Sequence, residues 1–123
     1  MLKEISQEYK KQEEENFNSI YSCINKQKSF VFNAGAGSGK TYALIECLKY
    51  LCVSSGERLS DNNQSIICIT YTNIAANEIK ERLGNNSVVK VSTIHERMWN
   101  FIKGYQKELV GVHLDYVKEQ III

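Results

Sequence analysis

The sequence predicts an α/β fold, in which a parallel sheet carries helices on both of its faces. Short apolar runs at 29–33, 65–70 and 88–91 have the length and composition of buried strands. Each run is followed by a segment whose apolar residues recur at helical spacing, so strands and helices alternate along the chain. Such alternation gives parallel strands joined by right-handed helical crossovers.

The N-terminal part divides by composition. Residues 1–16 are rich in charged side chains, and we expect a solvated helix or a frayed tail there, outside a folded domain at 17–123. Phe17, Ile20 and the apolar residues after them follow helical spacing, which predicts an amphipathic helix over 15–27. That helix leads into the first strand.

The remaining helices are predicted by the same spacing. We expect a helix over 42–51, a second over 73–83, a third over 93–103 and a helical stretch from residue 105 onward. The segment 54–64 is rich in Ser and Asn and is predicted to be a loop.

A glycine-rich turn follows the first predicted strand. Glycine lets consecutive backbone N–H groups converge on phosphate oxygens, because no Cβ blocks the approach. The start of the next helix adds unpaired N–H donors and a partial positive charge. Lys40 is placed to neutralise the β- and γ-phosphates, and the Thr41 hydroxyl to bind Mg²⁺. Strand, turn and helix together predict a nucleotide-binding P-loop made by Ala34, Gly35, Ala36, Gly37, Ser38, Gly39, Lys40 and Thr41.

Composition sets limits on the class of protein. The net charge is +1, from 15 basic and 14 acidic residues, so bulk charge neither favours nor excludes a nucleic-acid partner. No apolar run approaches the roughly 20 residues that span a bilayer, and the N-terminus lacks the apolar block of a signal peptide. The four cysteines show no C-x-x-C spacing, which favours reduced, buried thiols over a metal or redox site. With nucleotide binding, these features predict a cytoplasmic protein without a membrane partner.

Two further motifs follow the second and third predicted strands. Residues 70–82 read Thr-Tyr-Thr-Asn-Ile-Ala-Ala-Asn-Glu-Ile-Lys-Glu-Arg, and Thr93-Ile94-His95 follows the third strand. Together with the P-loop, these segments resemble the UvrD/Rep-like group of superfamily 1 DNA helicases, in the N-terminal part of the first RecA-like ATP-binding domain. The resemblance covers most of residues 28–103. It implies a P-loop NTPase fold of the RecA-like type, which we expect to be incomplete at the C-terminal side.

The resemblance implies an ATP-dependent DNA helicase that couples ATP hydrolysis to 3′–5′ translocation on single-stranded DNA, with a role in DNA repair. Lys40 and Thr41 would be its catalytic residues, ATP and Mg²⁺ its cofactors, and Thr41 the Mg²⁺ ligand. Its partners would be single-stranded DNA and the remaining helicase domains or a nuclease subunit. We expect this chain alone to bind nucleotide and DNA without efficient hydrolysis, because it contains no apolar strand ending in an acidic pair to orient water.

Polar residues after the second and third strands are the expected DNA contacts. In an open parallel sheet, ligands bind at the carboxyl ends of the strands. Hydroxyl groups and helix N-terminal amides at that edge can bind phosphates, and the Tyr71 ring can stack on a base. The resemblance assigns strand contacts to both segments, so the predicted DNA-binding residues are Thr70, Tyr71, Thr72, Asn73, Thr93 and His95.

These residues also have structural interpretations. Thr72 or Asn73 could cap the helix that begins there. Tyr71 could pack under a loop, and His95 could bond to backbone at a helix start. Trp99 is expected to pack against the protein rather than to stack on a base.

Other function classes remain open at this point. One is a non-catalytic module that binds nucleotide or single strands, and another is a P-loop kinase, in which the segment 70–82 has no place. The helicase family also has a glutamine upstream of the P-loop that reads adenine. The corresponding region, 17–21, contains no glutamine, so adenine selectivity is an open question.

Overall fold

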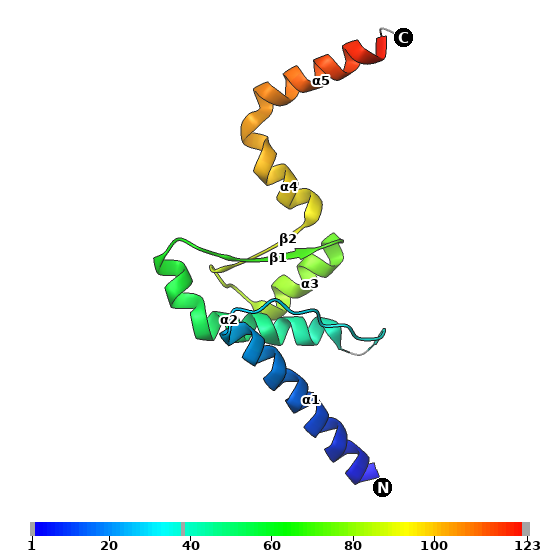
Figure 1. Cartoon of the computed structure of the whole chain (residues 1–123), viewed down its shortest axis with the longest axis vertical. Helices are drawn as coiled ribbons and strands as arrows, with labels where there is room; N and C mark the ends of the chain where they lie inside the picture. The colour runs from blue at the N-terminus through cyan, green and yellow to red at the C-terminus, as the bar shows by residue number, and fades with distance from the viewer. Residues whose placement is uncertain (1, 38, 122–123) are drawn as a thin grey trace.

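The computed structural model describes residues 2–37 and 39–121 and has an α/β architecture. A two-stranded parallel sheet lies at its centre, with a helix crossing between the strands. Figure 1 shows a long helix leaving this centre towards the N-terminus and a helical arm leaving it towards the C-terminus. The elements are α1 (Leu2–Asn25), α2 (Lys40–Asp61), β1 (Ile66–Thr70), α3 (Asn73–Leu83), β2 (Val89–Thr93), α4 (Ile94–Ile102), the 3-10 helix η1 (Lys103–Tyr105) and α5 (Gln106–Ile121).

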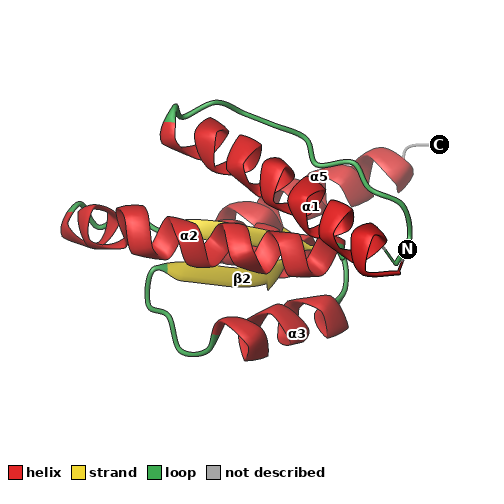
Figure 2. Cartoon of the chain, turned by 90° about the horizontal axis from the view of Figure 1, so that it is seen from below, coloured by secondary structure: helices red, strands yellow, loops and turns green. Residues whose placement is uncertain are grey.

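The core lies on one face of the sheet. β1 and β2 pair in parallel, with Cys68 opposite Val91. These two side chains meet helices α2 and α3, and Figure 2 shows both helices alongside the strands. Because Cβ atoms alternate across a strand, only every second residue of β1 and β2 enters this core. Its buried members are Leu48, Cys68, Ala76, Ile79 and Val91.

The other face of the sheet does not match the prediction that helices cover both faces. Ile67 and Ile69, which alternate with Cys68, are 45% and 51% exposed. Helix α4 leaves the end of β2 and continues away from the sheet (Figure 1). The continuous apolar run in β1 predicted burial on both sides, but such burial requires an element that packs across the second face.

The predicted strand at 29–33 is also not formed. Residues 28–35 have no regular secondary structure, and Val31 is 92% exposed. A strand is stabilised by hydrogen bonds to a neighbouring strand. Within the described ranges β1 pairs with β2 alone, so this apolar segment has no strand beside it.

Helix α2 continues through most of the predicted loop at 54–64 and ends at Asp61. Its inward stripe continues past Leu48 to the buried Gly56 and the half-buried Leu59, so packing extends the helix where composition favoured a loop. The end of α2 is set by Asn62, whose backbone and side-chain N–H groups both donate to the Arg58 carbonyl.

Residues 1–16 and 15–27, predicted as separate segments, form the single helix α1. Aromatic rings dock its second half on α2. Tyr21 stacks on Tyr50 with centroids 4.2 Å apart, and Phe17 meets the edge of Tyr42 at 6.1 Å. The Tyr50 hydroxyl also donates to Asn25 Oδ1 at 2.9 Å. These contacts hold α1 beside the glycine-rich turn.

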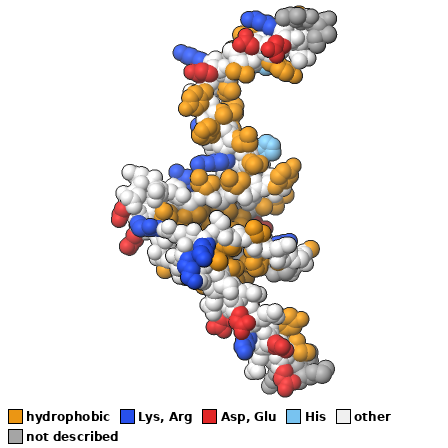
Figure 3. Space-filling view, in the orientation of Figure 1, with side chains coloured by type: hydrophobic (Ala, Val, Ile, Leu, Met, Phe, Trp, Pro, Cys, Tyr) orange, Lys and Arg blue, Asp and Glu red, His pale blue; other side chains and the backbone are white. Residues whose placement is uncertain are grey.

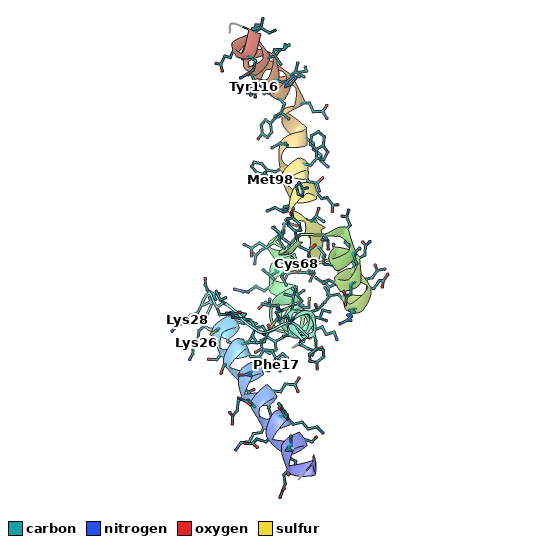
Figure 4. All side chains as sticks on the ribbon, turned by 90° about the vertical axis from the view of Figure 1, so that its right-hand side faces the viewer. Phe17, Lys26, Lys28, Cys68, Met98 and Tyr116 are labelled. Atoms are coloured by element: carbon teal, nitrogen blue, oxygen red, sulfur yellow. The ribbon has the colours of Figure 1, made fainter. Side chains whose placement is uncertain are left out.

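Helices α4 and α5 form an arm that contains no buried residue among those described. Figure 3 shows hydrophobic side chains gathered where the two helices join. Figure 4 shows Met98 and Tyr116 on this arm, well away from Cys68 in the core. None of the helices in the described part of the chain has both the length and the apolar character to cross a membrane.

Candidate functional site

The turn before α2 has the backbone geometry of an anion-binding loop. Gly37 and Gly39 have φ values of 74° and 77°, a left-handed conformation that glycine adopts without strain. Gly39 is the N-cap of α2, and no described side chain caps that helix start. The first amides of α2 are therefore available to an anion, and the helix dipole favours negative charge there.

Lys40 brings a positive charge to the same turn. Its Nζ donates to the Ala34 carbonyl oxygen at 2.7 Å, so the side chain folds back across the loop. This bond is solvent-exposed, and its modest net free energy lets a phosphate replace the carbonyl as partner. Thr41 is half-buried in the first turn of α2. Ser38, a predicted member of the loop, lies outside the described residues.

A hollow of roughly 480 Å³ opens beside this turn. Gly37 and Gly39 line one part of it, and α1 lines another. Nothing lies within 4 Å of the position that a Cβ on Gly37 would occupy, so the turn faces open space. The sequence interpretation missed the α1 wall of this hollow, because residues 1–16 were expected to be solvated. Amide side chains at i and i+4 in that segment were the available signal.

The residues after β1 divide between capping and exposure. Thr72 is the N-cap of α3, and its Oγ1 accepts from the Ala75 amide at 3.2 Å. The capping interpretation of Thr72 is therefore correct. Thr70 Oγ1 donates to the Thr72 carbonyl at 3.0 Å, so this hydroxyl is directed into the turn. Tyr71 is 82% exposed, and Asn73 is exposed as well.

The residues after β2 behave in the same way. Thr93 lies opposite Thr70 in the sheet register, is only 6% exposed, and caps α4 by accepting from the Glu96 amide at 3.2 Å. His95 is exposed in the first turn of α4. Trp99 is 53% exposed, so the expectation that it packs against the protein is wrong.

The strands and the glycine-rich turn are oriented alike. In Figures 1 and 2, the start of α2 and the carboxyl ends of β1 and β2 face the same side of the molecule. Parallel pairing brings the two strand ends together, and α3 and α4 begin there. The three predicted DNA contacts with exposed side chains at this edge are Tyr71, Asn73 and His95.

The described cysteines are all free thiols, in agreement with the sequence. Burial raises the pKa of Cys68, and burial followed by the nearby Glu46 carboxylate raises the pKa of Cys47. No cluster of His, Cys, Asp and Glu that could hold a metal occurs among the residues that the structure describes.

The chain belongs to the UvrD/REP helicase N-terminal domain family, whose model matches residues 4–120. It is 53% identical over 120 residues to the Gabija protein GajB of Bacillus cereus, covering 98% of this chain and 18% of that protein. It is 35% identical over 85 residues to a probable DNA helicase II homolog of Mycoplasma capricolum, covering 65% of this chain and 11% of the relative.

A third relative belongs to an ATP-dependent helicase/nuclease of Clostridium kluyveri. It is 36% identical over 66 residues, which cover 47% of this chain and 5% of the relative. The chain therefore spans less than a fifth of the length of these relatives. No solved structure matches it.

Proposed function

We propose that this chain is the nucleotide-binding part of an ATP-dependent DNA helicase. The observation that carries the proposal is the turn itself: Gly37 and Gly39 with positive φ, an uncapped start of α2, and Lys40 folded across the loop. Membership of the UvrD/REP helicase family and the helicase names of two relatives support it.

In this proposal the chain's own groups bind and orient the triphosphate. Backbone amides of the turn and of the first turn of α2 bind phosphate oxygens. Lys40 exchanges the Ala34 carbonyl for the β- and γ-phosphates, and the Thr41 hydroxyl is the Mg²⁺ ligand. Mg²⁺, when bound, neutralises charge on the phosphate oxygens.

The strand ends contribute the contact with single-stranded DNA. Tyr71 offers an exposed ring for base stacking, while the amides at the starts of α3 and α4 face the backbone phosphates. Translocation in the 3′–5′ direction, together with the remaining helicase domains or a nuclease subunit, is the part of the proposal that rests on family membership. None of the residues assigned here orients water, so the chain by itself should hydrolyse ATP slowly.

The test of the proposal is Lys40→Ala. Loss of the ammonium should weaken Mg²⁺-ATP binding at least about tenfold, because charge-assisted hydrogen bonds to phosphate are the strong ones in such a site. Isothermal titration of the chain with Mg²⁺-ATP measures the change. Lys49→Ala is the matched control, since Lys49 is on the same helix and pairs with Glu46 instead. Equal affinities of the Lys40 and Lys49 variants for ATP would contradict the proposal.

A further inference from the structure

We propose that the hollow between α1 and the glycine-rich turn is a subsite for an adenine base, in which Gln12 and Asn16 bind the edge of the base and Tyr42 packs against its face. The inference rests on the proposed function, because a base enters this hollow only when the turn holds the phosphates of its nucleotide.

The position of the hollow is the first argument. Gly37 and Gly39, the two residues that shape the anion loop, also line the hollow, so the phosphate site and the hollow are continuous. At roughly 480 Å³ it lies in the size range of small-molecule sites. Its remaining wall combines aromatic rings with polar side chains, as a heterocyclic base requires.

The polar groups on α1 are the second argument. Gln12 and Asn16 lie one helical turn apart and line the same hollow. Neither carboxamide is engaged by another described group. A carboxamide presents a donor and an acceptor side by side, and this pair matches the N–H donor and ring-nitrogen acceptor on the edge of adenine.

Glu13 also lines the hollow and defines the competing possibility. A carboxylate is an acceptor only, so it would suit the two adjacent donors on the edge of guanine. Two carboxamides against one carboxylate favour adenine, and a comparison of ATP with GTP separates the two bases.

The aromatic side chains are the third argument. Tyr42 is half-exposed in the first turn of α2, immediately after the two residues assigned to phosphate and Mg²⁺. Phe17 meets its ring edge-on, at an interplanar angle of 85°. Phe17 in turn stacks on Tyr21, and Tyr21 on Tyr50, so the amide face of α1 is held at a fixed place beside the turn. Figure 4 shows Phe17 where α1 meets the centre of the molecule.

The experiment compares three ligands, each with Mg²⁺: ATP, GTP and inorganic tripolyphosphate, which carries the phosphates without a base. Their affinities are measured by calorimetry for the whole chain and for Gln12→Ala, Asn16→Ala and Gln7→Ala. Gln7 is an exposed residue of α1 outside the hollow and is the matched control. Alanine is the strongest helix former, so α1 survives in all three variants, and circular dichroism verifies it.

We expect the unmodified chain to bind ATP more tightly than GTP or tripolyphosphate. Gln12→Ala and Asn16→Ala should each weaken ATP binding about three- to tenfold, the loss of one net hydrogen bond, and leave tripolyphosphate binding unchanged. Gln7→Ala should change neither. Restoring an amide with Asn16→Gln should recover part of the preference for ATP over tripolyphosphate.

Equal affinity for ATP and tripolyphosphate, or tighter binding of GTP, would overturn the adenine subsite while leaving the phosphate loop intact. Unchanged ATP affinity in both Gln12→Ala and Asn16→Ala would do the same. If neither ATP nor tripolyphosphate binds, the proposed function itself fails, and the subsite fails with it.

Discussion

Lys40 is already held at the turn before any ligand arrives. Its bond to the Ala34 carbonyl places the ammonium over the loop, so binding replaces one oxygen partner by another instead of ordering a mobile side chain. Preorganisation of this kind reduces the entropic cost of binding. The same residue therefore contributes both charge and geometry to the site.

Tyr71 gives the residue-scale prediction for DNA. Its exposed ring is proposed to stack on a base, so Tyr71→Ala should weaken binding of a single-stranded oligonucleotide by about 1–3 kcal/mol. Fluorescence anisotropy with a labelled oligothymidine measures this loss, and ATP affinity should not change. Tyr116→Ala is the control, because Tyr116 is an exposed tyrosine on the distant α5. A similar loss in both variants would rule out a specific role for Tyr71.

At the scale of elements, α3 connects the fold to the site. Its start carries the Thr72 cap next to the end of β1, and its inward face supplies Ala76 and Ile79 to the core. The helix is also the crossover that makes β1 and β2 parallel and so brings Thr70 opposite Thr93. Loss of packing along α3 therefore affects the position of the strand ends.

Ile79→Ala tests the packing of α3. Ile79 is 3% exposed, and truncation of a buried isoleucine costs about 2–5 kcal/mol through lost transfer energy and the cavity left behind. Urea denaturation followed by circular dichroism gives the free energy of unfolding. Ile74→Ala, at a position of the same helix that is 82% exposed, should change it by less than about 0.5 kcal/mol. Comparable losses at the two positions would mean that α3 is not packed as described.

At the scale of the whole molecule, buried thiols link stability to pH. Burial raises the pKa of Cys47, Cys52 and Cys68, so the folded state disfavours their thiolates. Folded pKa values above the unfolded ones mean that this contribution is fully present below the ordinary thiol pKa and is lost as pH rises through the raised values.

The midpoint of thermal unfolding should therefore fall between about pH 8 and pH 10 as these thiols ionise. Differential scanning fluorimetry measures the decline. Cys68→Ala lowers stability at every pH because Cys68 is buried, but its decline with pH should be shallower than that of the unmodified chain. An identical slope in the two proteins would exclude a contribution from Cys68.

The local pattern of the chain was sufficient to predict several features. The sequence interpretation placed β1, α3 and β2 within two residues of their observed bounds, because a short apolar run followed by helical spacing has one common outcome. It also placed the glycine-rich turn at the start of α2, since a run of glycines before a helix depends on nearest neighbours along the chain. The capping role of Thr72 was one of its stated alternatives.

The remaining features depend on what packs against what. The apolar segment at 29–33 forms no strand because no strand lies beside it in the described structure, and α2 passes Gly56 because its inward stripe continues to Leu59. The second face of the sheet stays exposed because α4 leads away from it. The hollow exists only because aromatic rings dock α1 on α2. Contacts between residues far apart in sequence create each of these features, and such contacts leave no periodic signal in the sequence itself.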